Sequence, residues 1–275
     1  MKRAGSLFPR LPRGCARAFA LMSVVLAWGG IREGAAGPVV PEAVACVEQA
    51  GLAGGVCVFV GRPDAEFAAS IAKLGHFVVH CLCANETTRD ALREELLALG
   101  APTGVSAAVL REERLPYTDN LVNLLVASLP GLDASGIGIG DVVRVLTPLG
   151  SAFIEAPTAR VAVEAQGVGA VHRLTMIADR NWARVDKPWP RQIDEWTHYL
   201  HGADGNAVAV DDLVGPPMHY QWQSGPKWLR SHETDSSLRT MVTSRGKLYY
   251  ILDESPISVA GNHPLPDKWF LVAQD

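Results

Sequence analysis

Short apolar runs alternate with amphipathic helical patterns between about Ala45 and Glu155, and this alternation constrains the fold more than any other feature of the chain. The predicted strands read GVCVFV, HFVVHCLC, GVSAAVL, LVNLLVA and SAFIEA, and the predicted helices read DAEFAASIAKLG, ETTRDALREELLALG and GIGDVVRVLTPLG. Strands that alternate with helices favour an α/β domain whose parallel sheet is covered on both faces. Such sheets hold their cofactors at the carboxyl ends of the strands, where the strand order reverses.

The pattern changes after about Arg160. HRLTMIAD and WARVDKPW predict a hairpin with its turn at Asp179-Arg180-Asn181, and RTMVTSRGKLYYILDE predicts another with its turn at Arg245-Gly246. KWFLVAQD predicts a further strand. We therefore expect an α/β domain over residues 40–160, a hairpin connector over 161–186 and antiparallel β strands over 187–275.

Residues 1–37 have the order of an export signal: basic residues, the apolar run FALMSVVLAW and then the small residues GAAG. The apolar run is too short for a membrane span, which needs roughly 20 residues. We expect an exported protein, periplasmic or extracellular, with no stable membrane span after signal removal; an uncleaved anchor is the alternative. The net charge of −4 argues against a nucleic-acid partner. The cysteine and histidine spacings predict no metal site.

A resemblance to a known family rests on KPWPRQIDEWTHYLHGADGNAVA, VGPPMHYQW, GPKWLRSHE, and RGKLYYILDESP leading to KWFLVAQD. Over these residues the chain resembles exported bacterial proteins that join a class I S-adenosylmethionine (SAM)-dependent methyltransferase-like domain to a pyrroloquinoline quinone (PQQ)-like β-propeller. LPYTDNLVNLLVA and VVRVLTPLGSAFI match the first module more loosely. The resemblance implies a Rossmann-like domain followed by the opening strands of an incomplete propeller that continues beyond Asp275, with PQQ as a cofactor only in such a longer chain.

The stretch VFVGRPDAEF, residues 58–67, lies where the resemblance implies the SAM loop. The family pattern has three glycines at alternate positions, and here these positions hold Gly61, Pro63 and Ala65. Pro63 lacks an N–H and Ala65 adds a methyl group, whereas Asp64 remains as a polar contact. The family also implies an acidic residue for the ribose at the end of the second strand, and the matching position holds Cys83. We therefore predict that SAM binding is weak or lost.

Three further polar stretches are candidate sites. Tyr117, Asp119 and Asn120 in LPYTDN either line a substrate pocket or form a capped turn, which Asp and Asn favour whatever their function. DEWTHYLHGADGN combines carboxylates with two histidines but lacks the second half of a di-iron pattern, which favours a polar connector in which Trp196 packs and the histidines bond locally. SHETD, residues 231–235, is either a loop or part of a propeller-axis site.

Three functions follow from these patterns. The first is a SAM-dependent methyltransferase-like domain with a degenerate cofactor site, fused to a propeller. The second is a non-enzymatic exported scaffold whose propeller binds a protein or a carbohydrate. The third is a fragment of a quinoprotein oxidoreductase. The chain contains neither a GxSxG elbow nor a P-loop, which argues against serine hydrolase and nucleotide triphosphatase chemistry.

Overall fold

A computed structural model of the chain describes residues 39–61, 64–100, 102–215, 229, 236–255 and 268–274. The chain divides into two units, Met1–Ala35 and Ala36–Asp275. The predicted export signal lies outside the described residues and stays a prediction. All of the structure reported below belongs to the second unit.

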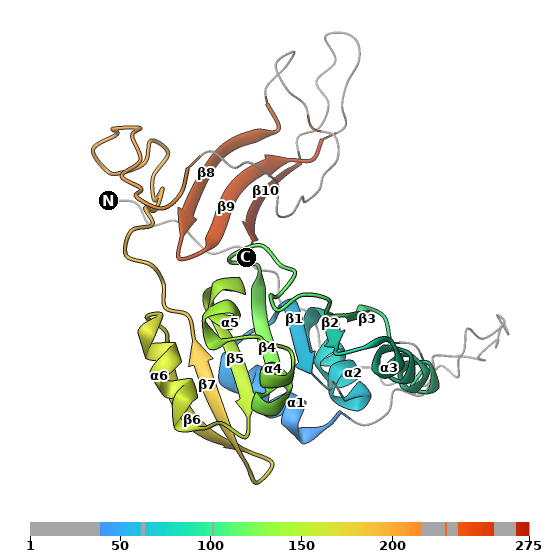
Figure 1. Ribbon diagram of the computed structural model, residues 1–275. Helices are drawn as coiled ribbons and strands as arrows, with labels where there is room; N and C mark the ends of the chain where they lie inside the picture. Colours follow the sequence, from blue (N-terminus) through green and yellow to red (C-terminus); the bar gives the residue numbers. More distant parts are fainter. Residues whose placement is uncertain are drawn as a thin grey trace, which may run out of the picture. The chain divides into compact units, whose positions relative to one another are not determined.

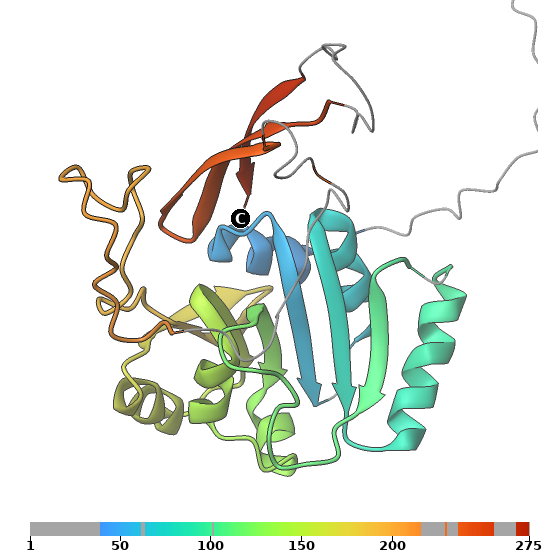
Figure 2. The ribbon, with the colours of Figure 1, turned by 90° about the horizontal axis from the view of Figure 1, so that it is seen from above.

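A seven-stranded sheet dominates this unit (Figures 1 and 2), in the order β3-β2-β1-β4-β5-β7-β6. β1, β2, β3, β4 and β5 are parallel, whereas β7 pairs antiparallel with both β5 and β6. Their bounds are β1 Gly54–Gly61, β2 His76–Cys83, β3 Val105–Val109, β4 Val122–Ser128, β5 Leu146–Glu155, β6 Val171–Ile177 and β7 Arg180–Asp186. The predicted parallel sheet is confirmed, and its strand order is that of a Rossmann-like fold.

β1 is central because nearly every residue of GVCVFVG is apolar or glycine and can be buried on both faces. Its side chains alternate between two apolar clusters: Val58 and Val60 pack in one, and Cys57 and Phe59 pack in the other. The sheet therefore has a core on each face.

Three helices pack on each face, as the two clusters show. The Cys57–Phe59 face is covered by α1 (Pro41–Ala50), α2 (Ala65–Leu74) and α3 (Glu86–Ala98). The other face is covered by α4 (Leu129–Ala134), α5 (Ile139–Val145) and α6 (Ala159–Gly167). Side-chain caps begin three of these helices, because Asp64, Asn85 and Ser128 each accept a hydrogen bond from the backbone N–H three residues later.

One predicted helix was too long. GIGDVVRVLTPLG was expected to be helical throughout, but α5 ends at Val145 and β5 begins at Leu146. Pro148 explains the early end, because proline cannot donate a helix hydrogen bond and disfavours helical backbone in the residue before it. Leu146 pairs instead with Val122 of β4.

The hairpin at residues 171–186 forms as predicted, with its turn one residue earlier than expected. Ala178 and Asp179 have positive φ values of 46° and 60°, which is the backbone of a two-residue hairpin turn. β7 also pairs with β5 from Glu155↔Trp182 to Ser151↔Asp186. The segment expected as a connector therefore supplies α6 and the last two strands of the main sheet.

A second sheet has three antiparallel strands in the order β10-β9-β8: β8 Leu238–Ser244, β9 Lys247–Asp253 and β10 Trp269–Gln274. The predicted Arg245-Gly246 turn is confirmed, since Ser244 pairs with Lys247 and both turn residues have positive φ. Cross-strand partners Val272, Tyr250 and Met241 lie on one face, and Leu271 and Ile251 lie on the other. Both faces of this sheet are therefore apolar.

Residues 187–214 contain no helix and no regular strand; they run beside the β8–β9 hairpin. Trp196 accepts a hydrogen bond from the Thr243 backbone N–H at 2.8 Å and donates its own backbone N–H to Thr243 Oγ1 at 2.9 Å. Glu195 accepts from the Arg245 backbone N–H at 2.7 Å. At the other end, Lys187 exchanges backbone hydrogen bonds with Leu149 and Gly150 of β5.

Within the part of the chain that is described, no helix is both long and apolar enough to cross a bilayer.

Candidate functional site

A cavity of about 1080 Å³ opens at the carboxyl ends of four parallel strands. Gly61, Ser128 and Glu155 end β1, β4 and β5, Ala84 follows β2, and all four residues line the cavity. The chain runs from β1 to β2 on one side and later adds β4 on the other, so the strand order reverses between β1 and β4. Parallel α/β sheets bind ligands at such a reversal. The cavity therefore lies where the sequence predicted a cofactor.

The β1–α2 loop keeps part of the expected cofactor geometry. Gly61 lines the cavity with φ +100°, a conformation that glycine adopts without strain. Asp64 also lines the cavity, and its Oδ1 accepts a hydrogen bond from the Phe67 backbone N–H at 2.9 Å. Pro63 lies outside the described residues, so the effect of its missing N–H on cofactor binding stays a prediction. Ala65 does not line the cavity; its methyl group is buried in the core, so the crowding expected from it is absent.

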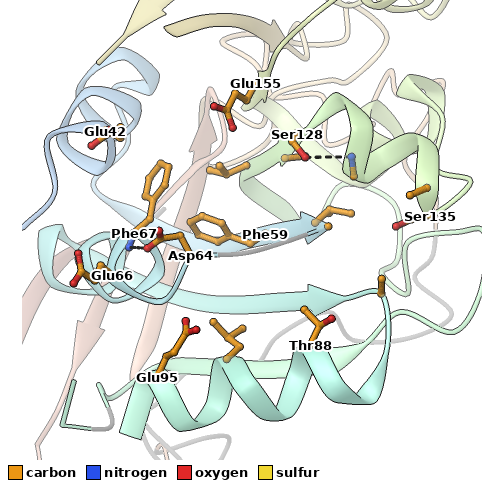
Figure 3. Close-up of a pocket in the computed structure, with 18 of the residues that line it drawn as sticks. Glu42, Phe59, Asp64, Glu66, Phe67, Thr88, Glu95, Ser128, Ser135 and Glu155 are labelled. Atoms are coloured by element: carbon orange, nitrogen blue, oxygen red, sulfur yellow. Dashed lines mark hydrogen bonds between the residues drawn. The ribbon is translucent and has the colours of Figure 1, made fainter. Parts of the chain in front are cut away.

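α4 approaches β1 closely beside this loop. A Cβ atom added to Gly61 would lie 3.0 Å from the Gly131 Cα, and one added to Gly131 would lie 2.8 Å from Ser128 Oγ. Ser128 Oγ in turn accepts the Gly131 backbone N–H at 3.2 Å (dashed line in Figure 3). Two glycines thus allow the backbone at the cavity edge to pack more tightly than any side chain would permit.

One face of α3 forms another wall of the cavity (Figure 3). Thr88, Ala91, Leu92 and Glu95 line it, and their spacing of three and four residues places them on one side of the helix. Asn85 fixes the start of α3 by accepting the Thr88 backbone N–H at 2.9 Å. The wall offers a hydroxyl group near one end and a carboxylate near the other.

Aromatic side chains form the apolar part of the cavity. Phe59 and Phe67 meet edge to face, with ring centroids 5.2 Å apart. Trp182 of β7 also lines the cavity and is 3% exposed. Its indole N–H has no hydrogen-bond partner within the described chain, although buried polar groups are normally paired. This N–H group is shielded from solvent, so the indole ring rather than its nitrogen forms part of the cavity surface.

Cys83 lies in a different place from the one the sequence suggested. Its side chain is fully buried in the core and does not line the cavity, whereas the next residue, Ala84, does. Burial raises the pKa of the Cys83 thiol, and Arg89 and Arg93 oppose that shift. At the end of β2 the position that lines the cavity is therefore Ala84, whose side chain offers no hydrogen bond.

Tyr117, Asp119 and Asn120 lie before the first residue of β4, whereas the cavity lies at its last residue, Ser128. None of the three lines the cavity. The Tyr117 hydroxyl bonds His80 Nδ1 at 2.7 Å, Asp119 accepts from Arg144 at 2.8 Å, and Asn120 accepts from Lys187 Nζ at 2.7 Å.

The burial of this loop shifts several pKa values. Desolvation raises the pKa of Tyr117 and lowers that of His80 and that of Lys187. Arg144 also donates to the Leu115 and Tyr117 carbonyl oxygens, so it holds the loop from several sides. These hydrogen bonds hold the loop as a turn against the rest of the domain.

The histidine-rich connector is also organised by local hydrogen bonds. Asp194 accepts from His201 Nε2 at 2.7 Å and from the Val210 backbone N–H at 2.6 Å, and these bonds lower its pKa, the backbone bond most of all. Trp196 packs against the His201 ring with centroids 5.2 Å apart. In the described ranges, no group of three or more His, Cys, Asp or Glu side chains could hold a metal ion. SHETD lies outside the described residues.

Several cavity residues escaped the sequence analysis, because they come from elements with no recognisable motif. Glu42 belongs to α1, Glu155 ends β5, and Arg180 and Trp182 belong to the hairpin that was expected to be a connector. Arg180 donates to Glu155 Oε1 at 2.7 Å. The only sequence signal was indirect: a polar residue at the end of a buried strand, as at Glu155.

Comparison with known proteins identifies no family for this chain. No family model matches this sequence, and no curated protein matches it. A SAM-dependent methyltransferase from Aquifex aeolicus is similar in structure, with 15% identity, a TM-score of 0.43, and coverage of 52% of this chain and 88% of its own. Precorrin-6y C5,15-methyltransferase from Geobacter metallireducens has 14% identity and a TM-score of 0.44, and the match covers 53% of this chain and 87% of that protein. The [4+2]-cyclase SpnF has 14% identity and a TM-score of 0.44, and the match covers 54% of this chain and 80% of that protein.

These similarities are slight, and the assignment of the fold rests on the chain's own topology. The order β3-β2-β1-β4-β5-β7-β6, with β7 antiparallel, gives the domain a Rossmann-like fold of the class I methyltransferase type. Fold alone does not establish activity.

Proposed function

We propose that the α/β domain binds SAM, with low affinity, in the cavity at the β1–β4 strand reversal. The observation that carries this proposal is the cavity itself, which lies at the ligand-binding edge of the sheet. Gly61, in a left-handed conformation, forms part of its wall. Its volume of about 1080 Å³ lies just above the usual range of ligand cavities, about 300 to 1,000 Å³, so a cofactor of this size has room to bind.

Low affinity follows from Ala84. A ribose hydroxyl at the end of β2 would find a methyl group where a carboxylate would accept a hydrogen bond. A charge-assisted hydrogen bond contributes about 1.5–3 kcal/mol, which corresponds to a loss of roughly tenfold to a hundredfold in affinity. A domain with this defect either transfers methyl groups slowly or uses bound SAM only structurally.

Calorimetric titration of SAM into the native chain and into two matched variants tests the proposal. Ala91 is an exposed residue of α3 that lines the cavity, whereas Ala98 is exposed on the same helix and does not line it. Ala91→Trp places an indole side chain in the cavity and should weaken SAM binding, and Ala98→Trp should leave it unchanged. Equal binding in both variants would exclude this cavity as the SAM site.

We also propose that the three-stranded sheet is the beginning of a propeller. Supporting this, β8–β10 present apolar residues on both faces, and the exposed fraction of Leu271 is 79% within the described chain. A sheet with two apolar faces is stable when further layers cover both. In the full-length product of the gene, Leu271→Lys should then destabilise the protein by several kcal/mol, whereas Leu97→Lys, on exposed α3, should change stability by less than about 0.5 kcal/mol. A neutral Leu271→Lys variant contradicts the proposal.

The export predicted from residues 1–37 remains part of the proposal, with the mature chain beginning near residues 36–39. N-terminal sequencing of the protein from an exporting host tests it, and retention of Met1 in the membrane fraction would indicate an anchor instead.

A further inference from the structure

Carboxylates dominate the charge of the cavity. The described lining residues include five carboxylate side chains, those of Glu42, Asp64, Glu66, Glu95 and Glu155. Arg180 is the single basic side chain among the same described residues. The cavity therefore has a negative potential, which attracts a positively charged group of a ligand and repels a phosphate or carboxylate group of a ligand.

Three of these carboxylates come from separate elements of the cavity wall, and all three are labelled in Figure 3. Glu42 lies in the first turn of α1, Asp64 caps α2, and Glu155 ends β5. Arg180 lies among them: it donates to Glu155 at 2.7 Å, and Glu155, then Glu42 and Asp64, raise the pKa of its guanidinium group. The structure thus already has a cation paired with Glu155, and Glu42 and Asp64 add to the negative field around it.

The N-terminus of α2 carries negative charge of its own, which disfavours an anion. Helix N-termini bind phosphates through free backbone N–H groups. Here the Asp64 carboxylate accepts the Phe67 N–H, and Glu66 places a second negative charge in the first turn. A nucleoside phosphate would therefore meet charge repulsion where many α/β sheets provide attraction.

One observation independent of the carboxylates indicates an organic ligand rather than a hydrated ion. Phe59 and Trp182, each 3% exposed, contribute aromatic surface to the cavity, and aromatic faces attract organic cations.

We propose that the cavity selects an organic cation, bound by Glu155 in the negative field to which Glu42 and Asp64 contribute, and that Arg180 is a built-in competitor for Glu155. The ligand has an apolar or aromatic body. Its cationic group displaces the Arg180 guanidinium from Glu155 when it binds. This inference rests on the proposed use of the cavity as a ligand site, and it assigns to Arg180 the control of affinity and of charge selectivity.

The competing interpretation treats Arg180–Glu155 as an ordinary surface ion pair that fastens the β6–β7 turn. Arg173–Asp186 provides a matched control on the same hairpin: its N–O distance is also 2.7 Å, and the arginine side chains are 58% and 63% exposed at residues 173 and 180. Arg173 does not line the cavity. A purely structural role predicts similar effects of Arg173→Gln and Arg180→Gln.

The experiment is calorimetric titration of the native chain, Arg180→Gln and Arg173→Gln with SAM, and with S-adenosylhomocysteine, which lacks the sulfonium charge. Trimethylphenylammonium serves as a simple aromatic cation that is independent of SAM chemistry. We expect Arg180→Gln to bind SAM and trimethylphenylammonium about three- to tenfold more tightly than the native chain at low salt. Its affinity for S-adenosylhomocysteine should be unchanged, and Arg173→Gln should behave like the native chain.

The outcomes separate the two proposals. If Arg180→Gln gains equally for SAM and S-adenosylhomocysteine, charge selectivity is wrong, although the cavity still binds the cofactor. If neither nucleoside binds to any variant but trimethylphenylammonium binds Arg180→Gln more tightly, the cation inference stands and the SAM proposal fails. If Arg180→Gln binds trimethylphenylammonium no better than Arg173→Gln does, the inference is overturned. A gain that persists unchanged in high salt also overturns it, because screening must weaken an electrostatic effect.

Discussion

Replacing Gly61 by alanine tests the closest backbone approach at the cavity edge, and Gly100→Ala is its matched control. Both glycines have positive φ, +100° and +88°. A Cβ atom at Gly100 would meet nothing within 4 Å, whereas one at Gly61 would lie 3.0 Å from the Gly131 Cα. The two variants therefore share the conformational cost and differ in the steric cost.

The magnitudes follow from these two terms. An alanine in left-handed backbone costs about 1–2 kcal/mol, so Gly100→Ala should lower the free energy of unfolding by that amount. Gly61→Ala adds overpacking against a backbone that cannot rotate away, which costs about 1–3 kcal/mol more. With a urea m-value of about 2 kcal/mol/M, the midpoint of Gly61→Ala should lie about 0.5–1.5 M below that of Gly100→Ala.

Urea unfolding followed by far-ultraviolet circular dichroism measures both midpoints. The reasoning fails if the two variants unfold at the same urea concentration, because the additional term comes only from the contact between Gly61 and Gly131. Gly61→Ala should also weaken SAM binding more than Gly100→Ala does, since only Gly61 lines the cavity.

Three further predictions concern other parts of the molecule. Ala84→Asp should strengthen SAM binding about tenfold or more in calorimetry. Cys83→Asp should instead lower the free energy of unfolding without any gain in SAM affinity, because its carboxylate would be buried in the core. A gain in affinity from Cys83→Asp alone would contradict the placement of these side chains. Burial raises the pKa of Cys46 and of Cys81 to about 12, so the folded state keeps these protons after the unfolded chain has released them. The free energy of unfolding should therefore fall as pH rises above about 9, by about 1.4 kcal/mol per pH unit for each thiol. Alkaline urea titrations in which Cys46→Ala and Cys81→Ala keep the native slope of stability against pH would refute this. The lowered pKa of Asp194 means that its hydrogen bonds stabilise the connector fully above the ordinary carboxyl pKa of 3.8 and less as pH falls below it, so Asp194→Ala should speed proteolysis of residues 187–214 at neutral pH but make little difference in strong acid.

The order of elements in the α/β domain could be predicted from residues that each act locally. GVCVFV and LVNLLVA are too apolar to be anything but buried strands, and ETTRDALREELLALG has both a helix cap and a helical apolar stripe. The hairpin turn at Arg245-Gly246 was equally clear. The exception was GIGDVVRVLTPLG, where the apolar spacing fits a helix and Pro148 and the pairing with β4 impose a strand from Leu146.

The candidate site was much less predictable. Gly61 and Asp64 could be recognised because a strand, a glycine and a helix cap follow one another along the chain. Cys83 was chosen because it ends a strand, yet a shift of one residue along a strand reverses the direction of the side chain, and Ala84 faces the cavity instead. Tyr117, Asp119 and Asn120 directly precede β4, which places them at the amino end of that strand and away from the cavity at its carboxyl end.

The sequence by itself determined the alternation of strands and helices, and with it a sheet with an apolar core on each face, because hydrophobic periodicity and helix caps act over a few residues. Only the tertiary structure decided what the cavity is made of. Glu42, Asp64, Glu155, Arg180 and Trp182 are separated by up to 140 positions in the chain and meet because β7 inserts antiparallel beside β5. Strand pairing between distant segments depends on the packing of the whole sheet, and no local pattern in the sequence encodes it.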